Sequence, residues 1–300
     1  MVIPRILTAA VIASMLGACN YNHPLNDDMA GAPTTQPAVH IPVIVTEYSP
    51  MPGQFINTTP PYTDGDNAES MTRKANEYLK NGYTISLGSW GGSITMHLTE
   101  PIRHRQSGRD FRVIGNAFDN SSAGTQNSGA SEPGIILVSA DDNGDGQPDC
   151  WYEIAGSEYR NSQAPFSITY TRSANGGATW MSSDGRSGTI EPNKFHTQPY
   201  FPLWSTSDKL TFTGRLLPDN GYLLPTGAFT QQSFEFGYAD NQPNSSERSI
   251  INLAWAVDSE GNSVELPSIH FIKIYTGVFQ ESAELGECST EICGIEIPSE

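Results

Sequence analysis

The chain has 300 residues, of which 33 are acidic and 16 are basic, and its formal net charge is −17. Such an acidic chain offers no basic patch that could neutralise phosphates, which excludes nucleic acid and anionic membrane surfaces as its main partners. Apart from the leader and tether described next, roughly 250 residues remain, enough for one large β domain or two small domains.

The start of the chain has the anatomy of a bacterial lipoprotein leader, which we assign to residues 1–19. Arg5 supplies positive charge, the apolar run at 6–15 is too short to span a bilayer, and the sequence LGAC closes the segment. This ending matches a lipobox, so we predict that Cys19 is lipidated and anchors the protein to the membrane. The alternative is an ordinary signal peptide cut after Ala18.

Residues 20–42 are rich in Asn, Pro and Thr and have no hydrophobic period, so we predict a flexible tether. Asn26, Asp27 and Asp28 resemble the export signals of surface lipoproteins. The expected location is therefore the outer membrane, with the domain at the cell surface.

Residues 43–300 are predicted to form one all-β domain. Short hydrophobic runs bounded by Gly, Pro, Asn and Asp recur along it, and FSITYT at 166–171 alternates in the manner of a half-buried strand. This spacing is typical of an antiparallel β-sandwich or jelly roll. The predicted strands cover 43–48, 83–87, 93–98, 111–114, 134–139, 150–154, 167–172, 209–215, 250–256 and 270–275.

One segment, 66–80, has helical periodicity instead. Asp66 or Asn67 can cap its start, and Asn81 with Gly82 can end it. We expect one short helix that covers an end of the sandwich, with its apolar side formed by Met71, Ala75, Tyr78 and Leu79.

The stretch DDNGDGQPD at 141–149 lies between two predicted strands and predicts a calcium-binding loop. Calcium takes roughly six to eight oxygen ligands, and three carboxylates packed so closely repel one another unless a cation neutralises them. The EF-hand pattern places a glutamate where this chain has Tyr152, so the loop is of another type, and a structural role is expected. A solvated turn without metal is the alternative. The predicted ligands are Asp141, Asn143, Asp145, Gln147 through its carbonyl, and Asp149.

Two further acidic stretches are weaker. Asp240, Asn241 and Asn244 are a candidate for an additional ligand or a second ion. The segment 258–262 has the composition of a plain hairpin turn.

The remaining cysteines leave the disulfide pattern open. Cys288 and Cys293 enclose a short loop and could pair in an oxidising compartment, with Cys150 as a lone thiol, or Cys150 could pair with the tail. The spacing does not fit a zinc site.

Exposed aromatic side chains on a rigid loop suit stacking on a sugar or a flat macrocycle. The segment 195–204 gathers such residues around two prolines, and SWGG at 89–92 is a second candidate. The alternatives are that these aromatics close the end of the sandwich and that Trp90 belongs to the core. The predicted ligand contacts are Trp90, His196, Tyr200, Phe201 and Trp204.

Catalysis is not expected. The sequence has no G-x-S-x-G, H-E-x-x-H or P-loop pattern, and its six histidines are scattered. Paired carboxylates of the glycosidase kind could come from Glu132, Glu153 and Glu158.

Taken together, several stretches resemble the lipid-anchored "cell surface proteins" of Bacteroidota that occur in corrinoid (vitamin B12) acquisition loci. The resemblance implies a surface lipoprotein whose jelly-roll-like domain captures a corrinoid and assists its uptake through an outer-membrane transporter. Glycan binding is the second hypothesis for the function, and glycoside hydrolase activity is the third. The stretches are VTEYSPMPGQFIN (45–57), SLGSWGGSI (86–94), GNAF (115–118), SEPGI (131–135), the acidic loop with WYE (151–153), AGSEY (155–159) and GECSTE (286–291).

Overall fold

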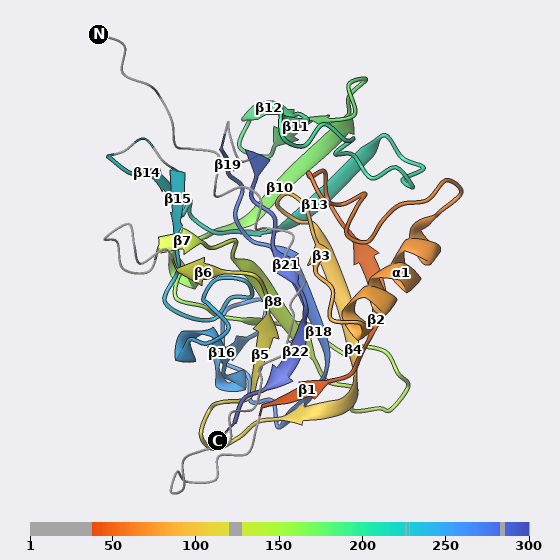
Figure 1. Ribbon diagram of the computed structural model, residues 1–300. Helices are drawn as coiled ribbons and strands as arrows, with labels where there is room; N and C mark the ends of the chain where they lie inside the picture. The colour runs from red at the N-terminus through yellow and green to blue at the C-terminus, as the bar shows by residue number, and fades with distance from the viewer. Residues whose placement is uncertain (1–37, 120–127, 226, 228, 283–285, 300) are drawn as a thin grey trace, which may run out of the picture.

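The computed structural model describes residues 38–119, 128–225, 227, 229–282 and 286–299 (Figure 1). The predicted leader, the lipidation of Cys19 and most of the tether lie outside these residues. Within them the chain is mostly β-strand, its sheets are antiparallel, and there is one α-helix, which confirms the all-β prediction. No helix in the described ranges combines the length and the hydropathy that a membrane span requires.

A six-stranded antiparallel sheet forms the centre, in the order β17-β9-β8-β18-β4-β2. Its middle strands are hydrophobic along nearly their whole length because both faces are covered. The strands are β2 (Val43–Ser49), β4 (Ser93–Arg103), β8 (Gly134–Ser139), β9 (Tyr152–Ile154), β17 (Ala256–Val257) and β18 (Ser268–Thr276).

A second sheet brings together the two ends of the domain in the order β1-β22-β5-β16. Val39 pairs with Ile297, so the folded part begins a few residues before the expected boundary at 43. Residues of both sheets share the main hydrophobic core. The strands are β1 (Val39–Ile41), β5 (Phe111–Ile114), β16 (Ile250–Ile251) and β22 (Gly294–Ile297).

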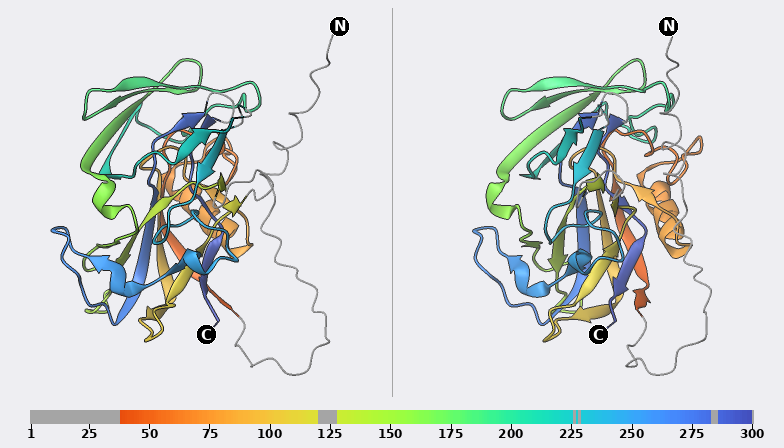
Figure 2. Two further views of the ribbon diagram at one scale, coloured as in Figure 1. Left: turned by 90° about the vertical axis from the view of Figure 1, so that its left-hand side faces the viewer. Right: turned by 60° about the vertical axis from the view of Figure 1, so that its left-hand side comes forward.

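Two more four-stranded sheets and two short ribbons complete the described fold. Figure 2 shows the sheet that contains β10 at the end of the molecule away from the C-terminus. One sheet has the order β12 (Ser187–Ile190), β11 (Ala178–Ser182), β10 (Gln163–Arg172), β13 (Lys209–Leu216). The other has the order β14 (Gly221–Leu223), β15 (Phe229–Gln232), β7 (Ser128–Ala130), β6 (Phe118–Asp119). The ribbons are β19 (Glu281–Ser282) with β20 (Gly286–Glu287), and β3 (Ile85–Ser86) with β21 (Glu291–Ile292).

These sheets form a propeller-like arrangement and not the jelly roll that the sequence suggested. The segment 250–256 illustrates the reason. It was predicted as one strand, but Asn252 accepts a hydrogen bond from the Ala254 amide at 2.8 Å and caps a short 3₁₀ turn at Leu253–Trp255. The chain therefore leaves one sheet at β16 and enters another at β17.

The predicted helix is confirmed as α1 (Ala68–Lys80). Asn67 and Ser70 form a reciprocal capping box at its start, which satisfies backbone N–H groups that have no partner within the helix. Met71, Ala75 and Leu79 are buried in the main core. Asn76 accepts a hydrogen bond from the Val45 amide at 2.9 Å, so α1 covers the edge strand β2 (Figure 1).

Candidate functional site

Trp90, predicted to contact ligand, is fully buried in a second hydrophobic core. Its ring meets Phe166 and Phe212 edge to face, at ring-centroid distances of 5.1 and 5.0 Å. The indole Nε1 donates a hydrogen bond to Arg215 O at 3.2 Å, so both the apolar ring and its polar atom are already engaged.

Three other predicted contacts are buried as well. Tyr200 and Phe201 belong to the same core as Trp90, and Trp204 stacks against Tyr48 and Tyr62. The rings of Tyr200, Phe201 and Trp204 are therefore not exposed to solvent. They fill the interior, which corresponds to the alternative weighed from the sequence.

His196 is the half-buried member of the predicted set. Its ring lies edge-on to Phe55, with 4.8 Å between the centroids, and burial lowers the pKa of the imidazole. The neutral ring can therefore hydrogen-bond a ligand at neutral pH.

The acidic loop joins β8 to β9, as predicted, and it is largely exposed. Its side-chain oxygens accept hydrogen bonds from the loop itself. The Asp145 amide donates to Asp141 Oδ1 and Asn143 Oδ1, at 3.0 and 2.8 Å, and the Gln147 amide donates to Asp145 Oδ1 at 2.8 Å. Asp149 Oδ1 accepts from Asn143 Nδ2 at 3.0 Å. Calcium binding by this loop stays a prediction.

The weaker acidic stretch at 258–262 is a turn stabilised by its own side chains. Asp258 Oδ1 accepts hydrogen bonds from the amides of Glu260 and Asn262, both at 2.9 Å, and Gly261 takes the positive φ that the turn needs.

Cys150, Cys288 and Cys293 are all thiols in the structure. Cys293 Sγ lies 3.3 Å from Thr84 Oγ1, and Cys288 Sγ accepts a hydrogen bond from Gln231 Nε2 at 3.6 Å. Burial raises the pKa of the Cys288 thiol well above its ordinary value, which keeps the thiol protonated.

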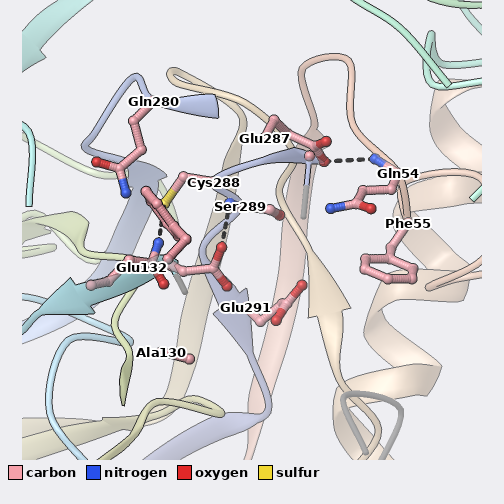
Figure 3. A pocket seen from close by; sticks show the side chains of 12 residues that line it. Gln54, Phe55, Ala130, Glu132, Gln280, Glu287, Cys288, Ser289 and Glu291 are labelled. Atoms are coloured by element: carbon pink, nitrogen blue, oxygen red, sulfur yellow. Dashed lines mark hydrogen bonds between the residues drawn. The ribbon is translucent and has the colours of Figure 1, made fainter. Parts of the chain in front are cut away.

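A pocket of about 60 Å³ lies between the ends of several strands (Figure 3). Half of its lining residues carry an amide or carboxyl side chain, and half-buried Phe55 and Phe229 lie beside them. The lining residues are Gln54, Phe55, Ala130, Glu132, Phe229, Gln231, Gln280, Gly286, Glu287, Cys288, Ser289 and Glu291.

Two polar atoms on this wall are buried and have no hydrogen-bond partner among the described residues. They are Gln280 Nε2 and Glu287 Oε2. The second polar atom of each side chain has partners. Glu287 Oε1 accepts a hydrogen bond from the Gln54 amide, and Gln280 Oε1 accepts hydrogen bonds from the amides of Asn220 and Gly221. Buried polar groups are normally paired, so these two atoms suit contact with a bound molecule.

Glu132, Asp240 and Glu291 bring their carboxyl oxygens to within 4.8 Å of one another. Two of these side chains, Glu132 and Glu291, line the pocket, and Figure 3 shows both beside Ser289. Within the described residues this is the one group of three or more acidic, histidine or cysteine side chains close enough to share an ion.

Backbone amides hold the carboxyl groups of Asp240 and Glu132 in place. Asp240 Oδ1 accepts hydrogen bonds from the amides of Asn116 and Ala117, at 2.8 and 2.9 Å, and Oδ2 accepts from the Glu291 amide at 2.9 Å. Glu132 Oε1 accepts from the Ser289 amide at 3.0 Å. Four separate segments of the chain therefore converge on these carboxyl groups.

Burial raises the pKa of every carboxyl group in this region. The pKa of Glu132 and the pKa of Glu287 rise to about 8, and the pKa of Asp240 rises to about 7. The pKa of Glu291 lies well above its ordinary range. In Glu132 and Glu291 the charge of Asp240 adds to the effect of burial. Among the residues that the structure describes, none of the four forms an ion pair.

The other two carboxylates considered for catalysis lie away from the pocket. Glu153 forms an ion pair with Arg215 at 2.7 Å, and Glu158 accepts a hydrogen bond from Asn161 at 2.9 Å. Only Glu132 of the three lines the pocket.

From the sequence, Glu132 is a candidate for a catalytic carboxylate and Asp240 for a metal ligand, and no local pattern indicates that the two residues lie together. Gln280 and Glu287 are not candidates from the sequence, because nothing in their local pattern sets them apart from ordinary surface residues. The pairing of β19 with β20 brings them to the same wall.

No known family model matches the chain, and no curated protein is similar to it in sequence.

Proposed function

We propose that the chain is a non-catalytic, lipid-anchored binding protein of the cell surface, which captures a polar extracellular molecule in the pocket beside Glu287. A corrinoid is the proposed ligand. The observation that carries the proposal is the pair of buried, unpartnered atoms, Gln280 Nε2 and Glu287 Oε2, on one pocket wall. A ligand that supplies partners for both removes the cost of leaving them unpaired.

The chemistry of the wall fits an amide-bearing ligand. A corrin ring carries primary amide groups around its edge, and each amide both donates and accepts hydrogen bonds. Gln280 offers a donor, and Glu287 offers an oxygen that accepts when ionised and can donate when protonated. The raised pKa of Glu287, about 8, keeps this side chain protonated at neutral pH.

The volume of the pocket limits the size of the ligand group that it can hold. A pocket of about 60 Å³ takes one side arm of a corrinoid and not the macrocycle. The ring itself would lie against the surface around the opening, where the half-buried Phe55 and Phe229 offer apolar contact. His196 lies against Phe55 and is therefore close enough to take part.

The remaining parts of the proposal rest on the sequence. Cys19 carries the lipid, residues 20–38 act as the tether, and an outer-membrane transporter receives the ligand. Calcium in the loop formed by Asp141, Asn143, Asp145, Gln147 and Asp149 stabilises the turn between β8 and β9. The close spacing of the oxygens of Asp141 and Asn143, which both accept from the Asp145 amide, supports this part.

The test is equilibrium dialysis of the full-length protein against cyanocobalamin and, separately, against a panel of neutral oligosaccharides. The informative variant is Gln280→Glu, which keeps an oxygen for the amides of Asn220 and Gly221 and replaces the unpartnered NH₂ group by a second carboxyl oxygen. Gln163→Glu, at an exposed position, is the matched control for the added charge.

Saturable cyanocobalamin binding that weakens at least tenfold in Gln280→Glu and is unchanged in the control is the expected result. Binding of an oligosaccharide with the same dependence on Gln280 would replace the corrinoid by a glycan. Failure of every ligand to bind a correctly folded protein would contradict the proposal.

A further inference from the structure

The pocket beside Glu287 carries acidic side chains and no basic ones. Its wall includes the carboxyl groups of Glu132, Glu287 and Glu291, and no lysine, arginine or histidine is among the described residues that line it. The charges that act on these three groups are those of Asp240, Glu281 and one another, and all of them are acidic. The wall therefore offers no positive charge to a bound group.

The basic groups nearest to this discussion do not change that. His196 lies against the pocket-lining Phe55, but burial lowers the pKa of its imidazole, so the ring is uncharged at neutral pH. Arg215 is committed to its ion pair with Glu153. Neither residue brings a positive charge to the pocket.

The wall is polar although it is largely uncharged. Glu287 is 5 % exposed, and its Oε2 has no hydrogen-bond partner in the described part of the chain. The pKa of Glu287 and that of Glu132 are about 8, so both carboxyl groups hold a proton at neutral pH, and a protonated carboxyl group both donates and accepts hydrogen bonds. Gln280 Nε2 adds a donor without a partner.

This wall distinguishes between two ligand groups of the same shape, a primary amide and a carboxylate. The amide is uncharged and has both donor and acceptor atoms, as the wall has. The carboxylate has acceptor atoms only, and it keeps its negative charge. Burying a charge that has no counter-charge costs far more than burying a neutral group that is hydrogen-bonded.

We infer that the pocket holds an uncharged amide group of its ligand and rejects the carboxylate of the same shape. The inference rests on the proposed function, because it takes this pocket as the place of capture. It fixes the charge of the group that enters and leaves the scaffold open, so it applies to a side arm of a corrinoid and to an acetamido group of a glycan.

A ligand carboxylate can enter such a pocket only after it has taken up a proton. A side-chain carboxyl group has a pKa of about 4.3 in water, so its protonated fraction rises roughly 25-fold between pH 6.5 and pH 5. Glu132 and Glu287 keep their protons over this interval. The affinity for the acid should therefore rise by about this factor as the pH falls, whereas the affinity for the amide should not.

The experiment is equilibrium dialysis of the full-length protein at pH 6.5 and pH 5. The probes are cyanocobalamin and its monocarboxylic acids, in each of which one side-chain amide has been hydrolysed. Two groups near the pocket have a shifted pKa that can fall inside this interval, His196 and Glu281. His196→Asn and Glu281→Gln remove them in turn, and the pH effect should persist in both variants.

The expected result is that one acid, made from the arm that enters, binds at least tenfold more weakly than cyanocobalamin at pH 6.5 and recovers at pH 5. The other acids should bind as cyanocobalamin does. If every acid binds within about twofold of cyanocobalamin, the inference fails and corrinoid capture stands. A deficit that does not shrink at pH 5 would also overturn the inference, because charge is then not its cause.

If cyanocobalamin does not bind, the proposed ligand fails, and the inference is decided with propionamide and propionate by saturation-transfer NMR of the same protein. Ala130→Leu fills the pocket, and Ala254→Leu, at an exposed position, is the matched control. At pH 6.5 propionamide should give a signal that Ala130→Leu abolishes and Ala254→Leu keeps, and propionate should give none. Equal signals from both probes, or none from propionamide, would overturn the inference. Should Ala130→Leu not fold, the comparison of the two probes on the unaltered protein decides.

Discussion

Glu291 donates its backbone amide to Asp240 Oδ2 at 2.9 Å, so two acidic residues 51 positions apart are joined by a main-chain hydrogen bond. The bond places the Glu291 carboxyl group beside that of Asp240 in spite of their like charge. Asp240 also has a positive φ of 48, unusual for a residue other than glycine. Glu291 lines the pocket, Asp240 holds its backbone amide, and the first predictions concern these two residues.

Asp240→Ala should strongly destabilise the protein. The substitution leaves the amides of Asn116, Ala117 and Glu291 without their acceptor, and each lost partner costs roughly 1 kcal/mol. Urea denaturation should show a loss of about 3 kcal/mol in the free energy of unfolding. Asp208→Ala, at a side chain that is 82 % exposed, is the control and should change it by less than about 0.5 kcal/mol.

Gly115→Ala should damage the same site without touching an acidic residue. A Cβ at this position would lie 2.4 Å from Asp240 Oδ1, closer than atoms can approach, so the Asp240 carboxyl group has to move. We expect a lower melting temperature. Gly65→Ala is the control, because its Cβ meets nothing within 4 Å and only the positive φ is strained. Equal effects of the two substitutions would argue against a role for the close contact.

Arg215→Met should destabilise the fold by about 3 kcal/mol or more, because it leaves the largely buried Glu153 without its ion-pair partner. It also removes the guanidinium group that lies 3.8 Å from the Tyr159 ring centroid. Chemical denaturation measures the effect. The double variant Arg215→Met, Glu153→Leu should recover much of the loss, and a double variant as unstable as the single one would contradict the explanation.

The stability of the calcium-free protein should fall as the pH rises from about 4.5 towards 8. Burial raises the pKa of Glu287 from 4.5 to about 8, so the folded state keeps a proton that the unfolded state has already released in this interval. The contribution is fully present below pH 4.5 and is lost as the pH approaches 8.

Glu287→Gln tests this dependence, since glutamine resembles the protonated acid and does not titrate. Melting temperatures measured in chelator across the interval should fall less steeply in the variant than in the unaltered protein. Parallel curves would show that Glu287 titrates normally. Glu281→Gln is a nearby control with a smaller upward shift of its pKa.

A chelator should lower the melting temperature, and the loop at 141–149 should account for part of the change. Asp145→Asn with Asp149→Asn should reduce the shift, because the loop would lose two of its charged oxygens. A melting temperature that does not respond to chelator in the unaltered protein would remove the predicted calcium site in this loop.

The parts of the fold that could be predicted are those in which one local signal dominates. The strands at 111–114 and 134–139 have the predicted ends, because both are short apolar runs between polar turn residues and are almost wholly buried. Helix α1 starts at the predicted cap, Asn67, because an amide side chain at that position satisfies free backbone donors.

What could not be predicted depends on contacts between distant segments. Strands such as β6 and β20 are two residues long and carry no periodicity, so only their partners define them. Tyr200 and Phe201 lie between two prolines, Pro199 and Pro202, which suggested an exposed loop, whereas both rings are buried in the structure. The acidic cluster joins three segments whose patterns are unrelated, and the sequence therefore offers each carboxylate only as a separate candidate.

The most direct test of ligand capture in the pocket beside Glu287 is a crystal structure of the full-length protein with cyanocobalamin and calcium. We predict a ligand amide within hydrogen-bond distance of Gln280 Nε2 and Glu287 Oε2, with the macrocycle outside the pocket. Density for a ligand at another place on the protein, with the pocket holding only water, would contradict it.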